Sequence, residues 1–375
     1  MADNTSSDNL HKFLESDDPA MIGMGLSMAK GSADSSEETL GRILGLYMFH
    51  DDKDIRSLSK SVFMKLASPD VKKVVKKYWQ AEYRTQPWIW KTGWMGKMVL
   101  DLRSEETTAI FILVKALQIN DEETKSSILE IIGNSMYDSF SSQECTDPNS
   151  EDYGKISFRK TGLKRNFSII STTAIVAAMI KLIKSFSTKR VYYSRQKQAN
   201  ISQINVVTAI EILGELGDTR AVETLIGSLN NTLIVQESTR ALRIIGDERA
   251  IEPIIQIMEY TINQRKESSY HSGWSRTGPA RWRDLNEFAK ALGKMGNLES
   301  IKTLVKGFDI ESSRSALSET EKMSVMEAIS KILERAKFDS KERENIIKFL
   351  TSEDASLRAM GNSLLKGMLN ESNME

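Results

Sequence analysis

The sequence is poor in cysteine, proline and aromatic residues, and each shortage narrows the possible class of protein. Cys145 is the single cysteine among 375 residues, which excludes an internal disulfide framework and a zinc site built from several thiolates. Six prolines and 7% aromatic residues are few, whereas the abundant Leu, Ile, Met, Ala, Glu and Lys favour helices over strands. The composition predicts an all-α protein.

The chain also has no net charge and no long apolar run. Lys plus Arg and Asp plus Glu number 51 each, so no net field draws the whole molecule to nucleic acid or to an anionic membrane. The longest uncharged stretch, 166–180, has 15 residues and is shorter than the roughly 20 that a membrane-spanning helix needs. The N-terminus lacks the basic-then-apolar pattern of a secretory signal. We expect a cytoplasmic protein without a membrane span.

One pattern recurs along the chain: an apolar helix end, a short turn with Asp or Asn, and a second helix that ends in Gly or another small residue. The turn aspartates can accept hydrogen bonds from the free N–H groups that open the second helix. The glycines can adopt the left-handed conformation that ends a helix. The predicted capping residues are Asp18, Asp52, Asp121, Asp354, Gly133, Gly217 and Gly246.

Two copies of the pattern are sharpest, beginning at Ala209 and Ser238, with Gly-Asp pairs at Gly217 and Gly246. In the first copy the apolar positions are Leu213, Leu216, Ala221, Val222 and Leu225, and the turn residues are Gly217, Asp218 and Arg220. This copy resembles the short HEAT-like repeats named after phycobilisome lyases. The resemblance implies an α-solenoid, a HEAT-like superhelix of stacked antiparallel helix pairs. The physics agrees, because one helix pair cannot bury its apolar stripe alone.

Two interruptions divide the predicted solenoid. The polar sequence around 139–160 predicts a loop or linker between N-terminal repeats at 1–138 and C-terminal repeats at 161–375. A second polar stretch, at about 262–283, predicts an insertion within the C-terminal repeats.

The segment 153–210 departs most from the balanced charge of the chain, because it contains 11 basic residues and no Asp or Glu. Basic side chains with interleaved aromatic rings can neutralise phosphates and stack on unpaired bases. The predicted binding residues come from this segment and from the insertion. They are Arg159, Lys160, Lys164, Arg165, Lys189, Arg190, Tyr192, Tyr193, Trp274 and Arg276.

All six tryptophans lie in or beside two further stretches that are rich in basic residues. They are Trp79, Trp88, Trp90, Trp94, Trp274 and Trp282. If these side chains are exposed they are contact anchors. The other interpretation is that they pack between repeats while the lysines form a solvated helix face, which is the commoner arrangement for aromatic residues at helix ends.

The sequence offers little support for an active site or a metal site. Iron-dependent hydroxylases of the HEAT-like superfamily hold metal with His-Glu pairs, and none of the three histidines here is followed by Glu. His50, Asp51 and Asp52 could offer ligands to a metal, but capping already explains the aspartates. Cys145 has no histidine nearby in sequence, and no Gly-rich phosphate loop is present. We expect no enzyme activity, cofactor or metal.

Three functions remain open at this point. The first is a non-catalytic scaffold that binds protein partners along the solenoid. The second is a nucleic-acid-binding solenoid that uses the segment 153–210. The third, an enzyme of the hydroxylase or bilin-lyase kind, rests on analogy between repeats alone.

Overall fold

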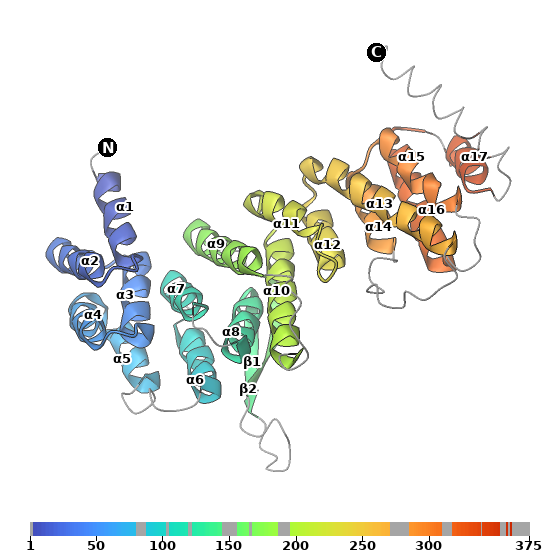
Figure 1. The fold of residues 1–375 in the computed structure, drawn as a ribbon. Helices are drawn as coiled ribbons and strands as arrows, with labels where there is room; N and C mark the ends of the chain where they lie inside the picture. The colour runs from blue at the N-terminus through green and yellow to red at the C-terminus, as the bar shows by residue number, and fades with distance from the viewer. Residues whose placement is uncertain are drawn as a thin grey trace. The chain divides into compact units, whose positions relative to one another are not determined.

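A computed structural model describes residues 3–79, 88–102, 105–118, 122–144, 156–164, 167–186, 196–270, 285–309, 317–338, 340–352, 358 and 361. Apart from one β-hairpin, the regular structure in these ranges is helical (Figure 1). The predicted fold class, an all-α solenoid of stacked helices, is confirmed. The chain divides into two compact units.

Unit 1 comprises Met1–Leu182 and Arg190–Thr208. Its helices are α1 (Asp3–Leu14), α2 (Pro19–Ser32), α3 (Glu37–Phe49), α4 (Lys53–Leu66), α5 (Pro69–Tyr78), α6 (Trp88–Asp101), α7 (Glu106–Ala116), α8 (Glu122–Ser135) and α9 (Ile169–Ser185). Consecutive helices pair, α1 with α2 and α3 with α4, and the pairs stack through α1 on α3 and α2 on α4. The stack continues from α3 to α7, and α6 packs on α8.

A β-hairpin follows α8, where the sequence predicts a polar loop. Strand β1 (Tyr137–Glu144) pairs antiparallel with β2 (Ile156–Lys164), with Phe140 opposite Lys160. The loop prediction is therefore wrong for 139–144 and 156–160. Aromatic and β-branched residues such as Phe140, Ile156 and Phe158 interrupt the polar sequence and favour strands.

The hairpin lies within unit 1, so it does not separate two domains as predicted. The division between the units falls instead within residues 183–208, and α10 (Gln196–Leu216) contributes residues to both units. The predicted boundary rests on polarity alone, and polarity does not distinguish a linker from a strand pair.

Unit 2 comprises Ile183–Lys189 and Ala209–Glu375. After α10 its helices are α11 (Val222–Ser228), α12 (Val235–Ile245), α13 (Ile251–Tyr270), α14 (Asn286–Met295), α15 (Leu298–Lys306), α16 (Glu319–Arg335) and α17 (Ser340–Leu350). Helices α12, α14 and α16 pack side by side in one layer, and α13 packs on α15 in the other (Figure 1). Short 3-10 helices lie at Thr219–Ala221, Glu248–Ala250 and Gly307–Asp309.

The predicted insertion at about 262–283 begins as helix, because α13 runs to Tyr270. The insertion therefore stays a prediction, and 271–284 lie outside the described residues. A buried ion pair explains how a helix with a polar C-terminal half stays packed. Arg265, 7% exposed, pairs with Glu321 of α16, 5% exposed, and Glu321 also accepts the N–H of Leu285 at 2.8 Å.

The capping predictions have mixed outcomes. Asp18 caps α2 by accepting the N–H of Ala20, and Asp52 caps α4 by accepting the N–H groups of Asp54 and Ile55, so both are confirmed. Asp121 and Asp354 lie outside the described residues.

Among the glycines, two of three predictions are confirmed. Gly217 and Gly246 have φ of 71° and 79°, the left-handed conformation that ends a helix. Gly133 instead lies inside α8, which continues to Ser135, so its prediction is wrong. The turn after Gly246 also joins two repeats. Arg249 pairs with Asp247 of the same turn and with Glu223 of the preceding repeat.

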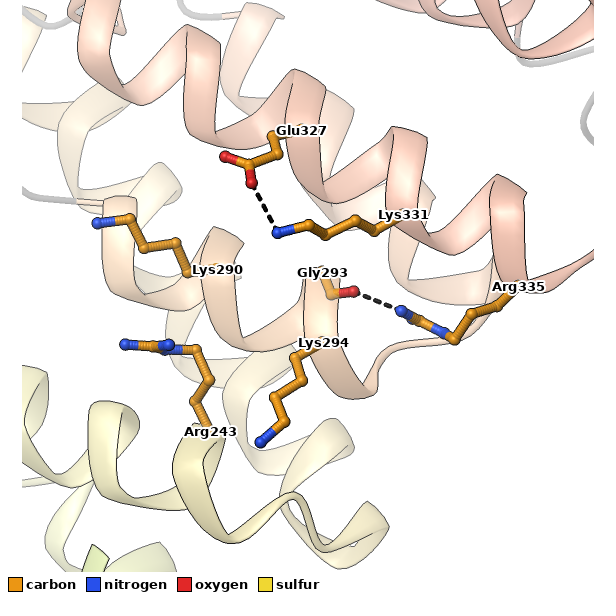
Figure 2. A pocket seen from close by; sticks show the side chains of 7 residues that line it. All are labelled: Arg243, Lys290, Gly293, Lys294, Glu327, Lys331 and Arg335. Carbon is orange, nitrogen blue, oxygen red and sulfur yellow. Dashed lines mark hydrogen bonds and ion pairs between the residues drawn. The ribbon is translucent and has the colours of Figure 1, made fainter. Parts of the chain in front are cut away.

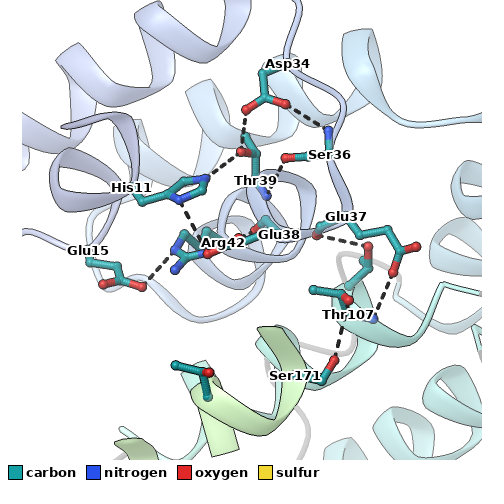
Figure 3. A network of polar contacts seen from close by, with 12 residues as sticks. His11, Glu15, Asp34, Ser36, Glu37, Glu38, Thr39, Arg42, Thr107 and Ser171 are labelled. Atoms are coloured by element: carbon teal, nitrogen blue, oxygen red, sulfur yellow. Dashed lines mark hydrogen bonds and ion pairs between the residues drawn. The ribbon is translucent and has the colours of Figure 1, made fainter. Parts of the chain in front are cut away.

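A network of polar side chains joins α1, α3, α7 and α9 within unit 1 (Figure 3). Glu37 of α3 accepts the N–H of Thr107 at 2.9 Å, and Ser171 of α9 donates to the Thr107 hydroxyl at 3.4 Å. At the other end, the Nε2 of His11 lies 2.9 Å from the hydroxyl of Thr39. The network fixes the order of four stacked helices through directional hydrogen bonds.

His11 sits in a crowded electrostatic environment within this network. Its Nδ1 lies 3.4 Å from Glu38, which also pairs with Arg42 at 2.8 Å. Burial, followed by the positive charge of Arg42, holds the pKa of His11 below its ordinary value, although Glu38, Asp34 and Glu15 oppose the shift. The imidazole is consequently a neutral structural group at neutral pH.

Among the described helices, none combines the length and apolar character needed to cross a bilayer.

Candidate binding surface

The structure describes only part of the predicted binding set. Arg159, Lys160 and Lys164 lie on β2, opposite Ser141, Phe140 and Tyr137 of β1. Of the ten predicted side chains only that of Lys164 is described, and it is exposed. The remaining residues lie outside the described ranges. They are Arg165, Lys189, Arg190, Tyr192, Tyr193, Trp274 and Arg276.

The tryptophans favour the packing interpretation where they are described. Trp79 is 5% exposed and its ring meets that of Phe49 edge-on, with centroids 6.0 Å apart. Trp94 is half-buried in α6. The contact-anchor hypothesis is therefore wrong for Trp79. The side chains of Trp88, Trp90, Trp274 and Trp282 lie outside the described residues.

A pocket of about 440 Å³ lies in unit 2 over the layer of α12, α14 and α16 (Figure 2). Three successive helices of this layer line it with charged side chains. The lining residues are Arg243 of α12, Lys290, Gly293 and Lys294 of α14, and Glu327, Lys331 and Arg335 of α16. We call this set the basic pocket.

Close helix packing forms the base of the basic pocket. A Cβ added to Gly293 would lie 2.9 Å from the Cα of Ala328, which is closer than such atoms approach one another. Helices α14 and α16 therefore come together on a Gly-Ala contact. Gly214 of α10 faces Ala241 of α12 in the same way, at 3.0 Å. Because Gly293 and Ala328 are small, the longer side chains around them form the walls of the basic pocket.

Two of the cations are held by backbone carbonyl groups at helix ends. Arg335 donates to the carbonyl of Gly293, in the last turn of α14, at 2.6 Å and to that of Gly296, just beyond the helix, at 2.5 Å. Lys294 donates to the carbonyl of Ile244 at 3.0 Å, near the end of α12. Positive charge at a helix C-terminus is stabilised by the helix dipole. Hydrogen bonds thus tie these two side chains to the backbone.

The other three cations share two carboxylates. Lys331 pairs with Glu327 at 2.6 Å, while Lys290 and Arg243 each lie 3.3 Å from Glu287. Five positive charges against the two negative charges leave a net charge of +3. This excess of positive charge favours the binding of an anionic group.

Sequence reasoning overlooked the basic pocket because its cations belong to separate repeats. Arg243 follows Ala241-Leu242, and Gly293, which also lines the pocket, follows Ala291-Leu292 at the matching position of the next pair. Aligning the repeats brings these positions together, whereas a search for local charge runs selects 153–210. The signal for this site in the sequence is the register of the repeats.

The residues considered for metal binding have structural roles. The Nδ1 of His50 accepts the N–H of Asp52 at 3.0 Å, and the carboxylate of Asp52 accepts the N–H of Asp54 at 2.7 Å. Hydrogen bonds to Ile55 and Asp54 hold the pKa of Asp52 below its ordinary value. Within the described ranges, no three His, Cys, Asp or Glu side chains converge on a possible metal site.

Comparison with known protein families agrees with the repeat geometry. The model of the PBS lyase HEAT-like repeat matches residues 207–231 and 236–260, which cover the end of α10 through the first half of α13. No curated protein sequence matches the chain. The HEAT-like resemblance predicted from the Gly-Asp turns is thus confirmed, and we identify two PBS lyase HEAT-like repeats between residues 207 and 260.

Proposed function

We propose that the protein is a non-catalytic repeat scaffold that binds a partner protein at the basic pocket. The observation that carries the proposal is the convergence of five cations from three successive helices on one open surface. Ligand sites that span several repeats are typical of solenoids, because stacked helices present an extended surface. A cytoplasmic location remains our expectation from the sequence.

Nucleic-acid binding through 153–210 is the second candidate. Lys164, exposed on β2, is the one predicted contact whose side chain supports it. An enzyme of the hydroxylase or bilin-lyase kind is the third candidate and rests on repeat analogy alone. We favour the scaffold because the basic pocket is a formed feature of unit 2.

Site-specific photo-crosslinking tests the scaffold proposal. Lys290, which lines the basic pocket, is replaced by p-benzoylphenylalanine in the full chain, and the variant is irradiated in an extract of its source cells. The control carries the same residue in place of Lys302, which lies on α15 in the other layer. We expect a defined protein to be crosslinked from position 290 and not from position 302.

Competition by excess unmodified chain should abolish that product. Equal crosslinking from both positions, or crosslinking to nucleic acid alone, counts against a protein scaffold at this surface.

A further inference from the structure

We infer that the segment bound by the basic pocket is an extended acidic peptide whose carboxylates are spaced about three residues apart. The inference rests on the proposed function and specifies its partner. The net charge of +3 and a volume of about 440 Å³ give the basic pocket the charge and size to hold several ligand groups.

Two of the exposed cations are Lys290 and Lys331, whose side chains are 45% and 54% exposed. Each pairs with a carboxylate on its own helix, Glu287 and Glu327 respectively. Exposed pairs of this kind contribute little to stability. Either lysine can therefore turn toward a ligand carboxylate at small cost to the fold.

Lys294 and Arg335 give the basic pocket its fixed geometry. Lys294 donates to the carbonyl of Ile244, and Arg335 donates to the carbonyls of Gly293 and Gly296. Figure 2 shows the bond between Arg335 and Gly293. Both positive groups thus lie at the ends of α12 and α14. Long side chains held in place lose less conformational entropy when a ligand binds. The basic pocket is in this respect organised before binding.

The distance between neighbouring helices of the layer sets the spacing of the carboxylates in the ligand. Packed helices lie about 8–10 Å apart, and the basic pocket takes its cations from three of them in succession. A peptide in the extended polyproline II conformation has three residues per turn and rises about 3.1 Å per residue, so side chains three residues apart lie on one face and about one helix spacing apart. A peptide crossing the layer meets a new helix, and new cations, at every third residue.

The carboxylates of Glu327, in the basic pocket, and of Glu287, which pairs with its cations, argue against a nucleic acid. A strand with a phosphate on every residue meets Glu287 and Glu327 as well as the cations, whereas a peptide can place an uncharged residue or a backbone N–H beside them. The described lining residues also include no aromatic ring on which a base could stack.

Fluorescence anisotropy with labelled peptides tests the inference on the full chain. The probe is a Gly/Ser peptide with glutamate at every third position, compared with a peptide of the same composition whose glutamates are contiguous. The pocket variant is Lys290→Gln, Lys294→Gln, Lys331→Gln. The matched control is Lys302→Gln, Lys322→Gln, Lys348→Gln, which removes the same charge from unit 2 elsewhere.

We expect the spaced peptide to bind the wild-type chain and the control equally, and the pocket variant at least about tenfold more weakly, with affinity that falls as salt rises. The contiguous peptide should bind more weakly than the spaced one. Circular dichroism confirms that both variants are folded.

Three results overturn the inference: no peptide binding, equal loss in both variants, or a single-stranded oligonucleotide that binds the basic pocket in place of the peptide. Crosslinking from position 290 still decides the scaffold proposal separately. A crosslinked protein together with an inert acidic peptide rejects the ligand class and keeps the scaffold.

Discussion

Among single residues, Arg265 and Glu321 form the buried ion pair of unit 2, and breaking it should be costly. Replacing one partner leaves the other charge buried and uncompensated. We predict that Arg265→Met lowers the free energy of unfolding by about 3 kcal/mol at pH 7. Urea unfolding followed by circular dichroism measures the loss. Lys302→Met, which breaks the exposed pair with Glu299, is the control and should cost about 0–1 kcal/mol.

The pH dependence of this loss provides a second check. Glu321 has a pKa below its ordinary value of 4.5, since hydrogen bonds from Arg265 and from the backbone of Leu285 and Ser318 outweigh the opposing effect of burial. Its stabilising contribution is present above pH 4.5 and is lost as the pH falls through the folded pKa. The difference between Arg265→Met and wild type should therefore shrink toward pH 4. A difference independent of pH contradicts the assignment of the loss to Glu321.

His11 should make the stability depend on pH in a higher pH range than Glu321 does. Its pKa in the folded protein lies below the ordinary 6.5, so the unfolded chain binds a proton more readily. Stability is complete above pH 6.5 and declines as the pH falls from there through the folded pKa. In His11→Gln this decline between pH 7 and 5 should be reduced, because the amide keeps a hydrogen-bond donor near Thr39 and does not titrate. Thermal unfolding across this range measures it, and an unchanged profile rejects the role of His11.

At the scale of helices, we expect close packing around a glycine to outweigh the higher helix propensity of alanine in setting the stability. Ala favours a helix over Gly by about 1 kcal/mol. At Gly293 the added methyl meets Ala328, so we predict that Gly293→Ala destabilises by about 1–3 kcal/mol. Gly227→Ala in α11 is the control, since nothing lies within 4 Å of its Cβ position, and should be neutral or stabilising. Differential scanning calorimetry compares the two, and equal melting temperatures contradict the packing role of Gly293.

The helices also show which features the sequence could predict. Asp52 and Gly217 act within one turn of the chain, so their neighbours in sequence were enough to predict caps. Gly133 follows the same local pattern but lies inside α8, because burial of the surrounding Ile and Leu residues outweighs the helix-ending tendency of glycine. The hairpin was missed because pairing of β1 with β2 depends on residues separated by the turn. The basic pocket was missed because its side chains come from three repeats.

For the molecule as a whole, each helix pair of a stacked repeat protein contacts mainly its neighbours, so we expect a destabilising substitution to open the structure only locally. Phe288 of α14 and Phe63 of α4 are both fully buried, at 1% and 0% exposure, in units 2 and 1. Truncating a buried Phe to Ala costs about 3–5 kcal/mol. We predict that Phe288→Ala speeds amide hydrogen exchange in α12, α14 and α16 and leaves α3 and α4 protected.

Phe63→Ala should produce the opposite pattern, and the two variants serve as controls for each other. Hydrogen exchange read by mass spectrometry resolves the peptides concerned. Local opening is expected because the packing partners of α3 are α1, α4 and α7, all within unit 1. If either variant accelerates exchange equally in both units, the chain unfolds as one cooperative body, and coupling between the repeats then exceeds what nearest-neighbour packing supplies.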